Sequence, residues 1–367
     1  MDKPAVVVLF GGRSSEHSIS SATAGGVLRA IDRERFRVIP VGITREGAFV
    51  LEEDDPDKFT LDPAHMPEVA DNGTRILWPE AAGEHGLRVR QVDGAIDDLG
   101  DVDVVLPILH GPHGEDGTIQ GFFDTLELPY AGGGVLDSAL CMDKHFMKIA
   151  LQAAGVPVAP WVTVRKREWS GDPDATADVA RRAAAFSFPW FVKPARAGSS
   201  VGVSKVHGPE ELAAALEIAF AEDDKVLVEE GLRGREIEVG VLEGRGGASD
   251  RASLPGEIVL TTREFYDFEG KYLGGDGVDV VCPAELAGSE IDALQRMALE
   301  AFEAVAGQGL ARVDFFLSED GPVVNELNTM PGFTPISMFP KCWIASGLTY
   351  SALISELVDT ARERGAA

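Results

Sequence analysis

The feature that most constrains the fold is a repeated alternation of short, wholly apolar runs with segments of helical spacing. The first run, residues 5–10, is rich in β-branched side chains and ends at a glycine pair, after which residues 20–31 carry apolar side chains at helical intervals. Residues 37–41 and 103–109 repeat the apolar run. Because such strands are buried on both faces, the pattern predicts an α/β domain with a doubly wound parallel sheet.

Further units are expected, since 367 residues exceed what one hydrophobic core usually organises. Helical spacing over residues 138–154 stops at a glycine- and proline-containing segment, where we place a boundary. A small mixed unit follows, and strands dominate from residue 235, with a long helix at 289–306. Residues 51–94 are rich in acidic residues, proline and glycine and are expected to form a surface loop with one hairpin. The other expected elements are strands at 190–193, 225–229, 236–242, 254–260, 311–317 and 322–327 and a helix at 209–220.

Composition excludes several functional classes. The formal net charge of −27 repels phosphate polymers and anionic lipids, so we expect no nucleic-acid partner and no membrane attachment. The apolar runs are too short to cross a bilayer, and the first residues lack a signal-peptide pattern, which predicts a cytoplasmic protein. The cysteines Cys141, Cys282 and Cys342 are far apart and odd in number, so we interpret them as buried or idle thiols rather than a disulfide framework or zinc site.

The most specific local signal is a predicted hairpin whose strands carry polar side chains. An Asp-Gly step at residues 320–321 favours a hairpin turn, and counting outward brings Asp314 to within about one residue of lying opposite Glu326. Glu326 and Asn328 share one face because strand side chains alternate. Three oxygen ligands on a rigid hairpin suit magnesium that bridges nucleotide phosphates. The alternative is a solvated polar face, on which Arg312 is the salt-bridge partner of the carboxylates.

A lysine followed by a glycine- and serine-rich loop is the candidate phosphate-binding segment. Lys193 ends an apolar run, and residues 197–202, which include Ser199 and Ser200, offer N–H groups and hydroxyls that can close over phosphates. The alternative is an ordinary mobile loop. The sequence contains no GxxxxGK[ST] motif and no GxGxxG spacing, which argues against a Walker-type site and against a dinucleotide-binding enzyme.

Two segments of the first domain carry further polar candidates. Glu16 lies where the first strand feeds the first helix, at the edge of the sheet where such folds bind ligands. It can hold an ammonium group or merely place a charge at the helix N-terminus. The loop 110–117 contains His110, Glu115 and Asp116 but no zinc-ligand spacing. We interpret it as a polar loop in which Glu115 and Asp116 cap the next helix.

Taken in order along the chain, these segments resemble the D-alanine:D-alanine ligases of the ATP-grasp superfamily, nearly from end to end. The order of the blocks identifies the resemblance, because any single block is weak. The matching blocks are residues 11–16, 110–111, 114–118, 142–144, 193–194, 198–202, 271–272, 312–314 and 325–334.

The resemblance implies three domains: a doubly wound substrate-binding domain at residues 1–140, a central ATP-grasp lid at 141–233 and a C-terminal ATP-grasp catalytic domain at 234–367. ATP would lie between the last two. Glu230-Gly231 replaces a lysine and an aromatic residue of some relatives, so adenine contacts are expected from the backbone. The implied cofactor-binding residues are Lys144, Lys193 and Ser200 for the phosphates, Glu229, Glu230 and Leu232 for adenine, and Glu236 for ribose. The implied ligands of two magnesium ions, for which manganese can substitute, are Asp314, Glu326 and Asn328.

The implied reaction joins two D-alanines through D-alanyl phosphate, because transfer of the γ-phosphoryl group gives the carboxylate a leaving group. A hydrogen-bond triad would close the loops and exclude water from this intermediate. The implied residues are Glu16 for the first ammonium, Ser199 and Tyr272 for the triad with Glu16, Arg312 and the N–H of Gly332 for the oxyanion, and His110, Lys271 and Ser337 for substrate binding.

Three alternatives remain open at this point. The first is a ligase of the same fold that makes D-alanyl-D-lactate or a dipeptide ending in D-serine; Tyr272 favours D-alanyl-D-alanine, since D-lactate users carry a histidine there. The second is another ATP-grasp carboxylate ligase, against which Glu16 and Lys271 argue. The third is an inactive nucleotide-binding regulator, against which the intact metal-binding hairpin argues. The expected partners are D-alanine and ATP, and the family usually forms homodimers.

Overall fold

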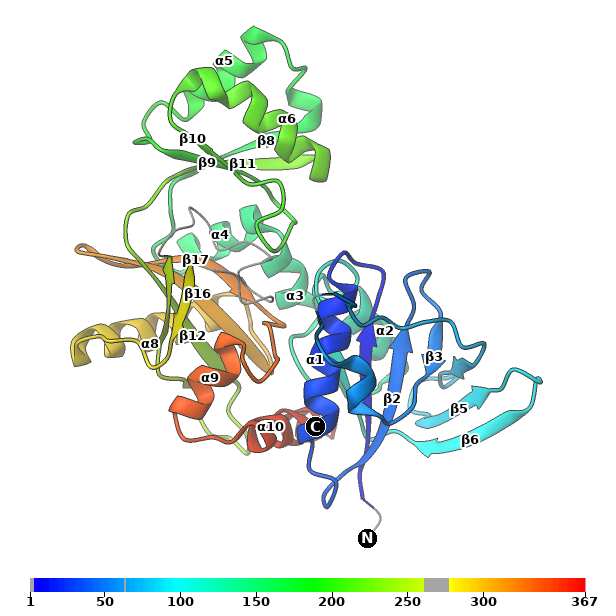
Figure 1. The fold of residues 1–367 in the computed structure, drawn as a ribbon. Coiled ribbons are helices and arrows are strands. Elements are labelled where there is room, and N and C mark those ends of the chain that lie inside the picture. The colour runs from blue at the N-terminus through cyan, green and yellow to red at the C-terminus, as the bar shows by residue number, and fades with distance from the viewer. Residues whose placement is uncertain (1–2, 63, 261–276, 367) are drawn as a thin grey trace.

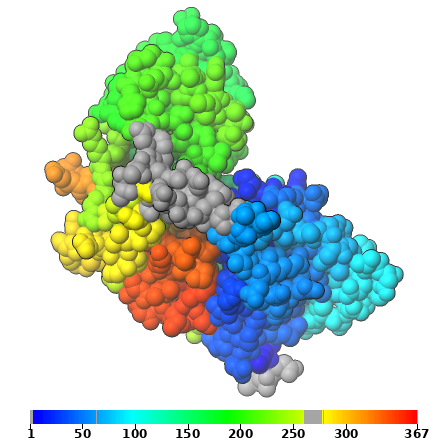
Figure 2. Space-filling model, in the orientation of Figure 1, coloured from blue at the N-terminus to red at the C-terminus, as the bar shows by residue number. Residues whose placement is uncertain are grey.

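The computed structural model describes residues 3–62, 64–260 and 277–366 of the chain. It has three lobes, drawn as ribbons in Figure 1 and as a space-filling surface in Figure 2. The N-terminal lobe, blue to cyan, lies beside the C-terminal lobe, yellow to red, and the green central lobe lies above them in both views. Each lobe is built around its own sheet, and the segments that connect the sheets meet near the centre of the molecule.

The N-terminal lobe contains a four-stranded, mainly parallel sheet. Its elements are β1 (Ala5–Gly11), α1 (His17–Ala30), β2 (Arg37–Ile43), β3 (Phe49–Leu51), η1 (Pro56–Phe59), β7 (Val104–Ile108) and α2 (Thr118–Leu126). The strand order is β3-β2-β1-β7, with β1 parallel to both neighbours and β3 an antiparallel edge. Val6, Val8 and Phe10 pack in one core with α1, whereas Val7 and Leu9 pack in another with α2. The predicted doubly wound α/β sheet is therefore confirmed.

Residues 51–94 are mainly loop and contain one hairpin, at residues 75–90, as predicted, but the sequence does not predict that a further strand at 96–101 extends this hairpin to a sheet. β4 (Arg75–Leu77), β5 (Gly86–Arg90) and β6 (Ile96–Asp101) form a three-stranded antiparallel sheet. Leu87 and Val89 alternate with arginines along β5 and are completely buried in the same core as Phe123 of α2. This alternation is a strand signal, but it extends over one short strand, and the acidic composition of β6 obscures it.

The central lobe is a four-stranded antiparallel sheet covered by helices. Its elements are β8 (Trp161–Arg165), η2 (Lys166–Glu168), α5 (Pro173–Arg182), β9 (Trp190–Pro194), β10 (Ser204–Val206), η3 (Pro209–Glu211), α6 (Leu212–Glu222) and β11 (Lys225–Glu230), in the order β10-β9-β11-β8. Val192 and Val228 pack in one core with Phe220 of α6. Lys193 and Glu229 follow them directly on β9 and β11, so strand alternation points both toward the opposite face.

Two short helices, α3 (Val135–Met142) and α4 (Lys144–Ala153), join the first and central lobes. The sequence predicts a single helix over residues 138–154, and the structure divides it at Asp143. Asp143 has an extended backbone, and its carboxylate accepts hydrogen bonds from the N–H groups of His145 and Phe146. It therefore caps α4, and the break places Lys144 at the first position of that helix.

The C-terminal lobe contains a six-stranded antiparallel sheet. Its elements are β12 (Arg235–Leu242), β13 (Arg251–Ala252), β14 (Gly256–Leu260), β15 (Val278–Val281), α8 (Gly288–Ala304), β16 (Leu310–Ser318), β17 (Gly321–Asn328) and α9 (Met338–Ala345), with the order β15-β14-β12-β16-β17 and β13 paired to β12. Ile237 and Val313 pack against α8. Gly240 lies on the other face, against α9. Arg312 and Asp314 flank Val313 and so share the face opposite α8.

The last helix, α10 (Tyr350–Gly365), returns to the first sheet. Leu353 and Leu357 pack in one core with Val6 and Phe10 of β1 and with Phe339 of α9. This shared core joins the N-terminal and C-terminal lobes and fixes the β1–α1 turn relative to the β16–β17 hairpin. Among the helices of the described residues, none is both long and apolar enough to cross a membrane.

The packing of α9 on β12 yields a stability prediction. A Cβ atom at Gly240 would lie 2.7 Å from Trp343 Nε1 and 3.1 Å from the Phe339 ring. Gly240→Ala should therefore lower the free energy of unfolding by about 1–3 kcal/mol, the usual cost of overpacking. Gly288→Ala, where the Cβ would meet open space, is the matched control and should not destabilise. Denaturant titrations compare the two variants, and equal midpoints would contradict the packing account.

Candidate active site

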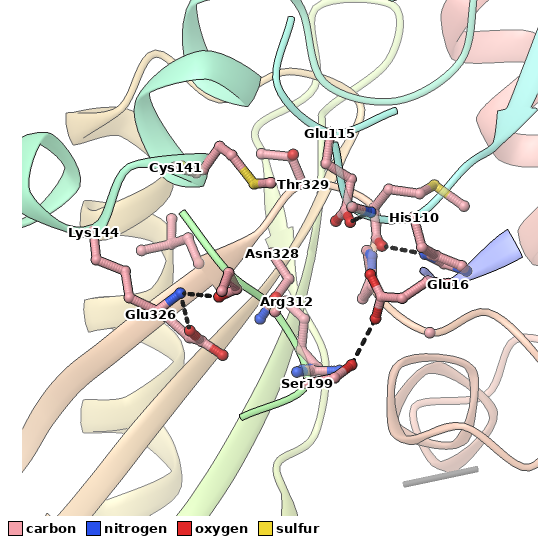
Figure 3. A pocket seen from close by; sticks show the side chains of 18 residues that line it. Glu16, His110, Glu115, Cys141, Lys144, Ser199, Arg312, Glu326, Asn328 and Thr329 are labelled. Carbon is pink, nitrogen blue, oxygen red and sulfur yellow. Dashed lines mark hydrogen bonds and ion pairs between the residues drawn. The ribbon is translucent and has the colours of Figure 1, made fainter. Parts of the chain in front are cut away.

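The predicted site residues converge on a small cavity where the three lobes meet (Figure 3). Its volume is about 80 Å³. The walls come from the turn before α1, the loop after β7, the start of α4, the glycine- and serine-rich loop and the β16–β17 hairpin with its following loop. The predicted residues in these walls are Glu16, His110, Lys144, Ser199, Arg312, Glu326, Asn328 and Gly332.

Glu16 reaches across the cavity instead of capping its own helix. It occupies the N-cap position of α1 without a side-chain cap hydrogen bond. Ser199 Oγ donates to Glu16 Oε1 at 2.6 Å, between positions 183 residues apart (Figure 3). Ser199 and Ser200 have φ values of 51° and 57°, in the left-handed region that disfavours residues with a Cβ atom. The contact therefore holds a strained loop of the central lobe against the N-terminal lobe.

The β16–β17 hairpin brings the three predicted metal ligands together. Asp314 lies directly opposite Glu326, and Arg312 lies opposite Asn328. A register shift between Asp314 and Phe315 produces this pairing. Asn328 Nδ2 donates to Asp314 Oδ2 at 3.0 Å. The oxygen atoms of the three ligands thus lie on neighbouring positions of one face of the sheet.

Arg312 is a buried cation between two carboxylates. Its Nε and Nη2 donate to Asp314 Oδ1 and Oδ2 at 2.6 and 2.7 Å, and Nε lies 3.0 Å from Glu238 Oε2. Burial lowers the pKa of Arg312, but the charges of Asp314 and Glu238 outweigh it and raise the pKa well above its ordinary value. The guanidinium is therefore a permanent, oriented positive charge in the wall of the cavity that Gly332 also lines.

A second, larger cavity adjoins the first between the central and C-terminal lobes. Its volume is about 350 Å³, and it shares Lys144 and Glu326 with the small cavity. Lys144 Nζ lies 3.3 Å from Glu326 Oε2 and donates to the Ala197 carbonyl at 2.9 Å. The two cavities therefore meet at a lysine–glutamate ion pair. The predicted nucleotide-binding residues that line the larger cavity are Lys144, Lys193, Ser200, Glu229, Glu230, Leu232 and Glu236.

Glu229 is a buried carboxylate shared by two lysines. Lys193 Nζ lies 2.7 Å from Glu229 Oε2, and Lys148 Nζ lies 3.2 Å from Glu229 Oε1. Burial raises the pKa of Glu229, but the charges of Lys148 and Lys193 outweigh it and hold the pKa below its ordinary value. Burial lowers the pKa of Lys148, a completely buried residue of α4, to about 8. Lys148 therefore holds in place the Glu229 carboxylate with which Lys193 pairs.

The prediction that Glu115 and Asp116 both cap α2 is half wrong. Asp116 Oδ1 accepts from the N–H of Thr118 at 3.0 Å, as a cap does. Glu115 instead turns into the small cavity, because the loop folds back at Gly111 and the N–H of Gly111 donates to Glu115 Oε2 at 2.5 Å. Burial and the neighbouring charge of Glu16 raise the pKa of Glu115 to about 8. Its carboxyl group is therefore mainly protonated at neutral pH.

His110 is a buried imidazole in the cavity wall. Its Nδ1 donates to the Met330 carbonyl at 3.1 Å, since a carbonyl can only accept. Burial lowers the pKa of His110, which favours the neutral ring. With the proton on Nδ1, Nε2 is an acceptor, and it has no hydrogen-bond partner among the described residues. The cavity therefore offers an acceptor that suits a donor group of a substrate.

The predicted site residues still to be described are Ser337, Lys271 and Tyr272. Ser337 is the N-cap residue of α9, and its Oγ lies 2.7 Å from Thr334 Oγ1. Among the described residues that line the two cavities, Ser337 is absent. Lys271 and Tyr272 lie outside the described residues, so their roles stay predictions.

The hairpin suits a hard divalent cation by the chemistry of its donors. Within the described ranges, no three His, Cys, Asp or Glu residues form a group that could hold a metal ion. The set on the hairpin is of another kind, because it consists of two carboxylates and one amide. Arg312 holds the carboxylate of Asp314, and Lys144 lies beside that of Glu326. Oxygen donors of this kind fit magnesium, whose remaining positions phosphate oxygens and water usually complete.

Comparison with known proteins agrees with this geometry. Residues 5–133 match the family model described as D-ala D-ala ligase N-terminus, and residues 150–359 match D-ala D-ala ligase C-terminus. The chain is 49% identical over 365 residues to a D-alanine–D-alanine ligase from Paenarthrobacter aurescens (strain TC1), covering 99% of this chain and 96% of that protein. The chain belongs to the D-alanine–D-alanine ligase family.

Solved ligase structures have the same fold. The D-alanine–D-alanine ligase from Coxiella burnetii matches with a TM-score of 0.80 and 34% identity, over 100% of this chain and 96% of that chain. The VanG D-Ala:D-Ser ligase from Enterococcus faecalis matches with a TM-score of 0.81 and 31% identity, over 98% of this chain and 100% of that chain. The two-lobed ATP-grasp fold predicted from the sequence is therefore confirmed.

Sequence reasoning missed two buried charges beside the site. Lys148 lies one turn after Lys144 on α4, and Glu238 lies two residues after Glu236 on β12. Helix and strand periodicity therefore place each on the same face as a predicted residue, and this spacing is the signal that could have found them. Charged side chains are mostly exposed, so the local pattern alone favours solvent contact.

Glu115 yields a pH-dependent stability prediction. Its pKa is raised from 4.5 to about 8 in the folded state, so the folded protein holds this proton more tightly than the unfolded chain. The resulting stabilisation is complete below about pH 4.5 and is lost as the pH rises through about 8. Glu115→Gln should therefore lessen the fall in unfolding free energy between about pH 5 and pH 8.

Denaturant unfolding at several pH values measures this effect. Glu217→Gln, on the exposed side of α6, is the matched control and should keep the wild-type pH dependence. A Glu115→Gln protein with the same pH dependence as the control would contradict a protonated, buried carboxyl group.

Lys148 yields a prediction for nucleotide binding. Lys148→Met removes one of the two cations on Glu229, so Lys193 should pair more tightly with that carboxylate and become less available to phosphates. We expect the KM for ATP to rise about tenfold with a smaller change in kcat, as for a lost charged hydrogen bond. The control is Lys166→Met, which removes a lysine of the same lobe whose ammonium group donates to the Phe220 carbonyl. Steady-state kinetics measure the KM for ATP in both variants. Equal values in Lys148→Met and Lys166→Met would contradict the role of Lys148 in positioning Lys193.

Proposed function

We propose that the chain ligates two D-alanines to D-alanyl-D-alanine while ATP is cleaved to ADP and phosphate. The observation that carries the proposal is the junction of the two cavities at Lys144 and Glu326. A carboxylate bound in the small cavity lies within reach of the terminal phosphate of a nucleotide in the larger one. Membership of the D-alanine–D-alanine ligase family supports the choice of substrates.

Activation has to precede peptide-bond formation, because a carboxylate would have to lose oxide. A carboxylate oxygen of the first D-alanine attacks the γ-phosphorus of ATP, the bond to the β-phosphate oxygen breaks, and ADP leaves. The second D-alanine loses an ammonium proton, and its amine attacks the acyl carbon of D-alanyl phosphate. The tetrahedral oxyanion then collapses and releases inorganic phosphate. The site must therefore stabilise negative charge first on the phosphoryl group and then on the oxyanion.

The small cavity supplies the groups for both amino-acid ends. We assign Glu16 to the ammonium of the first D-alanine, with Nε2 of neutral His110 as a further acceptor. Arg312 and the N–H of Gly332 are assigned to the oxyanion. A fixed cation stabilises such a charge more strongly in a buried site than in water, and Asp314 keeps Arg312 in place. The proposal also assigns Lys271 and Ser337 to the acceptor carboxylate and Tyr272, with Ser199 and Glu16, to the closing triad.

The larger cavity supplies the groups for ATP. Lys144 and Lys193 are assigned to the phosphates, which would compete for them with Glu326 and Glu229. Magnesium neutralises phosphate charge during transfer when bound, and manganese is expected to substitute. The further assignments are Ser200 to phosphate, Glu229, Glu230 and Leu232 to adenine, Glu236 to ribose, and Asp314, Glu326 and Asn328 to two metal ions.

D-Serine is a second candidate acceptor, favoured by the likeness to the VanG D-Ala:D-Ser ligase. It differs from D-alanine by one hydroxyl group, which needs a hydrogen-bonding partner in the acceptor pocket. D-Lactate lacks an ammonium group, so it avoids the deprotonation step and should compete best at low pH.

One assay tests the proposed reaction and its acceptor. ADP release is measured with D-alanine, D-serine, D-lactate and L-alanine, alone and in equimolar mixtures, with products separated by mass. D-Alanine alone should give ADP and D-alanyl-D-alanine in equal amounts, and L-alanine should give neither. Another product dominating the mixture at neutral pH would overturn the acceptor, and ADP release without condensation would overturn the ligase.

We also propose the wider organisation of the protein. The domain limits are taken as 1–140, 141–233 and 234–367, in line with the separate sheets of the three lobes. A cytoplasmic location would give the enzyme access to ATP. A homodimer is proposed from the family, and light scattering during gel filtration, at several protein concentrations, measures the mass that decides it.

The contact of Ser199 with Glu16 predicts a coupling defect. Ser199→Ala removes the hydroxyl that ties the loop to Glu16, so water should reach the acyl phosphate and ATP hydrolysis without dipeptide should rise. A hydrogen bond to a charged group contributes about 1.5–3 kcal/mol, so the KM for D-alanine should rise about tenfold. Phosphate and dipeptide are measured in the same reactions.

Ser199→Gly is the matched variant for this test. It relieves the backbone at φ 51° but also lacks the hydroxyl, so it should uncouple as Ser199→Ala does. If Ser199→Gly couples ATP hydrolysis to dipeptide formation as the wild type does, the defect of Ser199→Ala comes from backbone strain. That result would contradict the role of the hydrogen bond.

A further inference from the structure

Two of the three cysteines lie in contact, although 60 positions separate them along the chain. Cys282 directly follows β15, Cys342 lies in α9, and their Sγ atoms are 3.8 Å apart. Both are free thiols in a small apolar cluster with Ile258 and Met338, and the proposed reaction uses neither. Their separation is close to van der Waals contact, so a movement of less than about 2 Å would join them.

The two thiols differ in accessibility and acidity. Cys282 is partly exposed, whereas Cys342 is completely buried. The hydrogen-bond contact with the Cys342 sulfur lowers the pKa of Cys282, burial opposes this, and the charge of Lys341 lowers the pKa further. The same interaction and burial raise the pKa of Cys342 well above its ordinary value. An accessible, more acidic thiol beside a buried partner is the arrangement of a peroxide-reactive cysteine with a resolving cysteine.

We propose that Cys282 and Cys342 form a modification site for hydroperoxides, at which oxidation closes a disulfide between the end of β15 and α9. The Cys282 thiolate attacks hydrogen peroxide, the O–O bond breaks, and sulfenic acid and hydroxide form. The Cys342 thiol then attacks the sulfenic sulfur, the S–S bond forms, and water leaves with the Cys342 proton. Hydroxide takes up the proton that Cys282 released. Two thiols are thus oxidised to one disulfide, and one peroxide is reduced to two waters.

The disulfide bears on the acceptor site, and this step rests on the proposed function. α9 begins directly after Ser337, the residue proposed for the acceptor carboxylate. A Cβ at Gly256 of β14 would lie 3.1 Å from Cys342 Sγ, so α9 packs directly on the strand backbone, and closing the disulfide would have to move α9 or the end of β15. Cys342 Sγ also lies 3.8 Å from the carbonyl of Glu238, whose carboxylate pairs with Arg312. Oxidation should therefore weaken binding of the acceptor D-alanine.

Peptide mapping of the full-length enzyme tests the site. The protein is treated with hydrogen peroxide, alkylated and digested without reduction. We expect a peptide pair linked through Cys282 and Cys342, lacking two hydrogen atoms and lost on treatment with dithiothreitol. Cys282→Ser should abolish the link and leave Cys342 reduced. Cys141→Ser is the matched control, because Cys141 lies in a different core, and it should link as the wild type does.

Two mapping results would overturn the site. One is the survival of three free thiols after peroxide treatment, and the other is oxidation of Cys282 to sulfinic acid without a linked pair. Mapping needs no turnover, so failure of the site is distinguishable from failure of the proposed ligase reaction.

Kinetics test the link to the acceptor site. Oxidation should raise the KM for the acceptor D-alanine about fivefold or more, with recovery in dithiothreitol and a smaller change in the KM for ATP. The Cys282→Ser enzyme should be unaffected by the same treatment. Two results would contradict an effect of the disulfide on the acceptor site. One is an unchanged KM for D-alanine in the disulfide-linked wild type, and the other is an equal rise of that KM in Cys282→Ser.

Discussion

A buried guanidinium between two carboxylates is the interaction on which the rest of the site depends. Moving a cation out of water costs several kcal/mol, so Arg312 is stable in the cavity wall only because Asp314 and Glu238 lie beside it. Asp314 lies opposite Glu238 on one neighbouring strand and opposite Glu326 on the other. The register of β12, β16 and β17 therefore sets the positions of the cation and of the proposed metal ligands together.

Local charge also explains how a chain of net charge −27 can bind a polyanion. Lys144 and Lys148 of α4 and Lys193 of β9 each lie beside a carboxylate of the protein. We propose that nucleotide binding is an exchange, in which phosphates would replace Glu326 and Glu229 as partners of lysines that are already in place. Such preorganisation avoids the cost of gathering positive charge when the substrate arrives.

The sequence predicted the elements whose signals are local. The apolar run of β1 and the Asp-Gly turn before β17 identified the first sheet and the hairpin, and strand alternation placed Glu326 and Asn328 on one face. Counting from the turn placed Asp314 about one residue away from the position opposite Glu326. The register shift between Asp314 and Phe315 accounts for this offset.

What the sequence could not predict depends on contacts between distant segments. Glu115 turns inward because of the fold of the loop around Gly111 and the burial it produces, and no spacing in the loop encodes this. The contact of Cys282 with Cys342 likewise joins residues 60 positions apart through the packing of α9 on β14. Burial of Lys148 on α4 depends in the same way on Glu229 of β11, which lies 81 positions later in the chain.

In the proposed reaction, a carboxylate in the small cavity receives the γ-phosphoryl group of ATP across the junction at Lys144 and Glu326. The most direct measurement uses D-alanine whose carboxylate carries an oxygen isotope label and determines the isotope content of the released phosphate. An acyl-phosphate route transfers one labelled oxygen to each phosphate, because the amine breaks the bond between the acyl carbon and that oxygen. We expect labelled phosphate in proportion to dipeptide. Unlabelled phosphate alongside dipeptide would contradict the account.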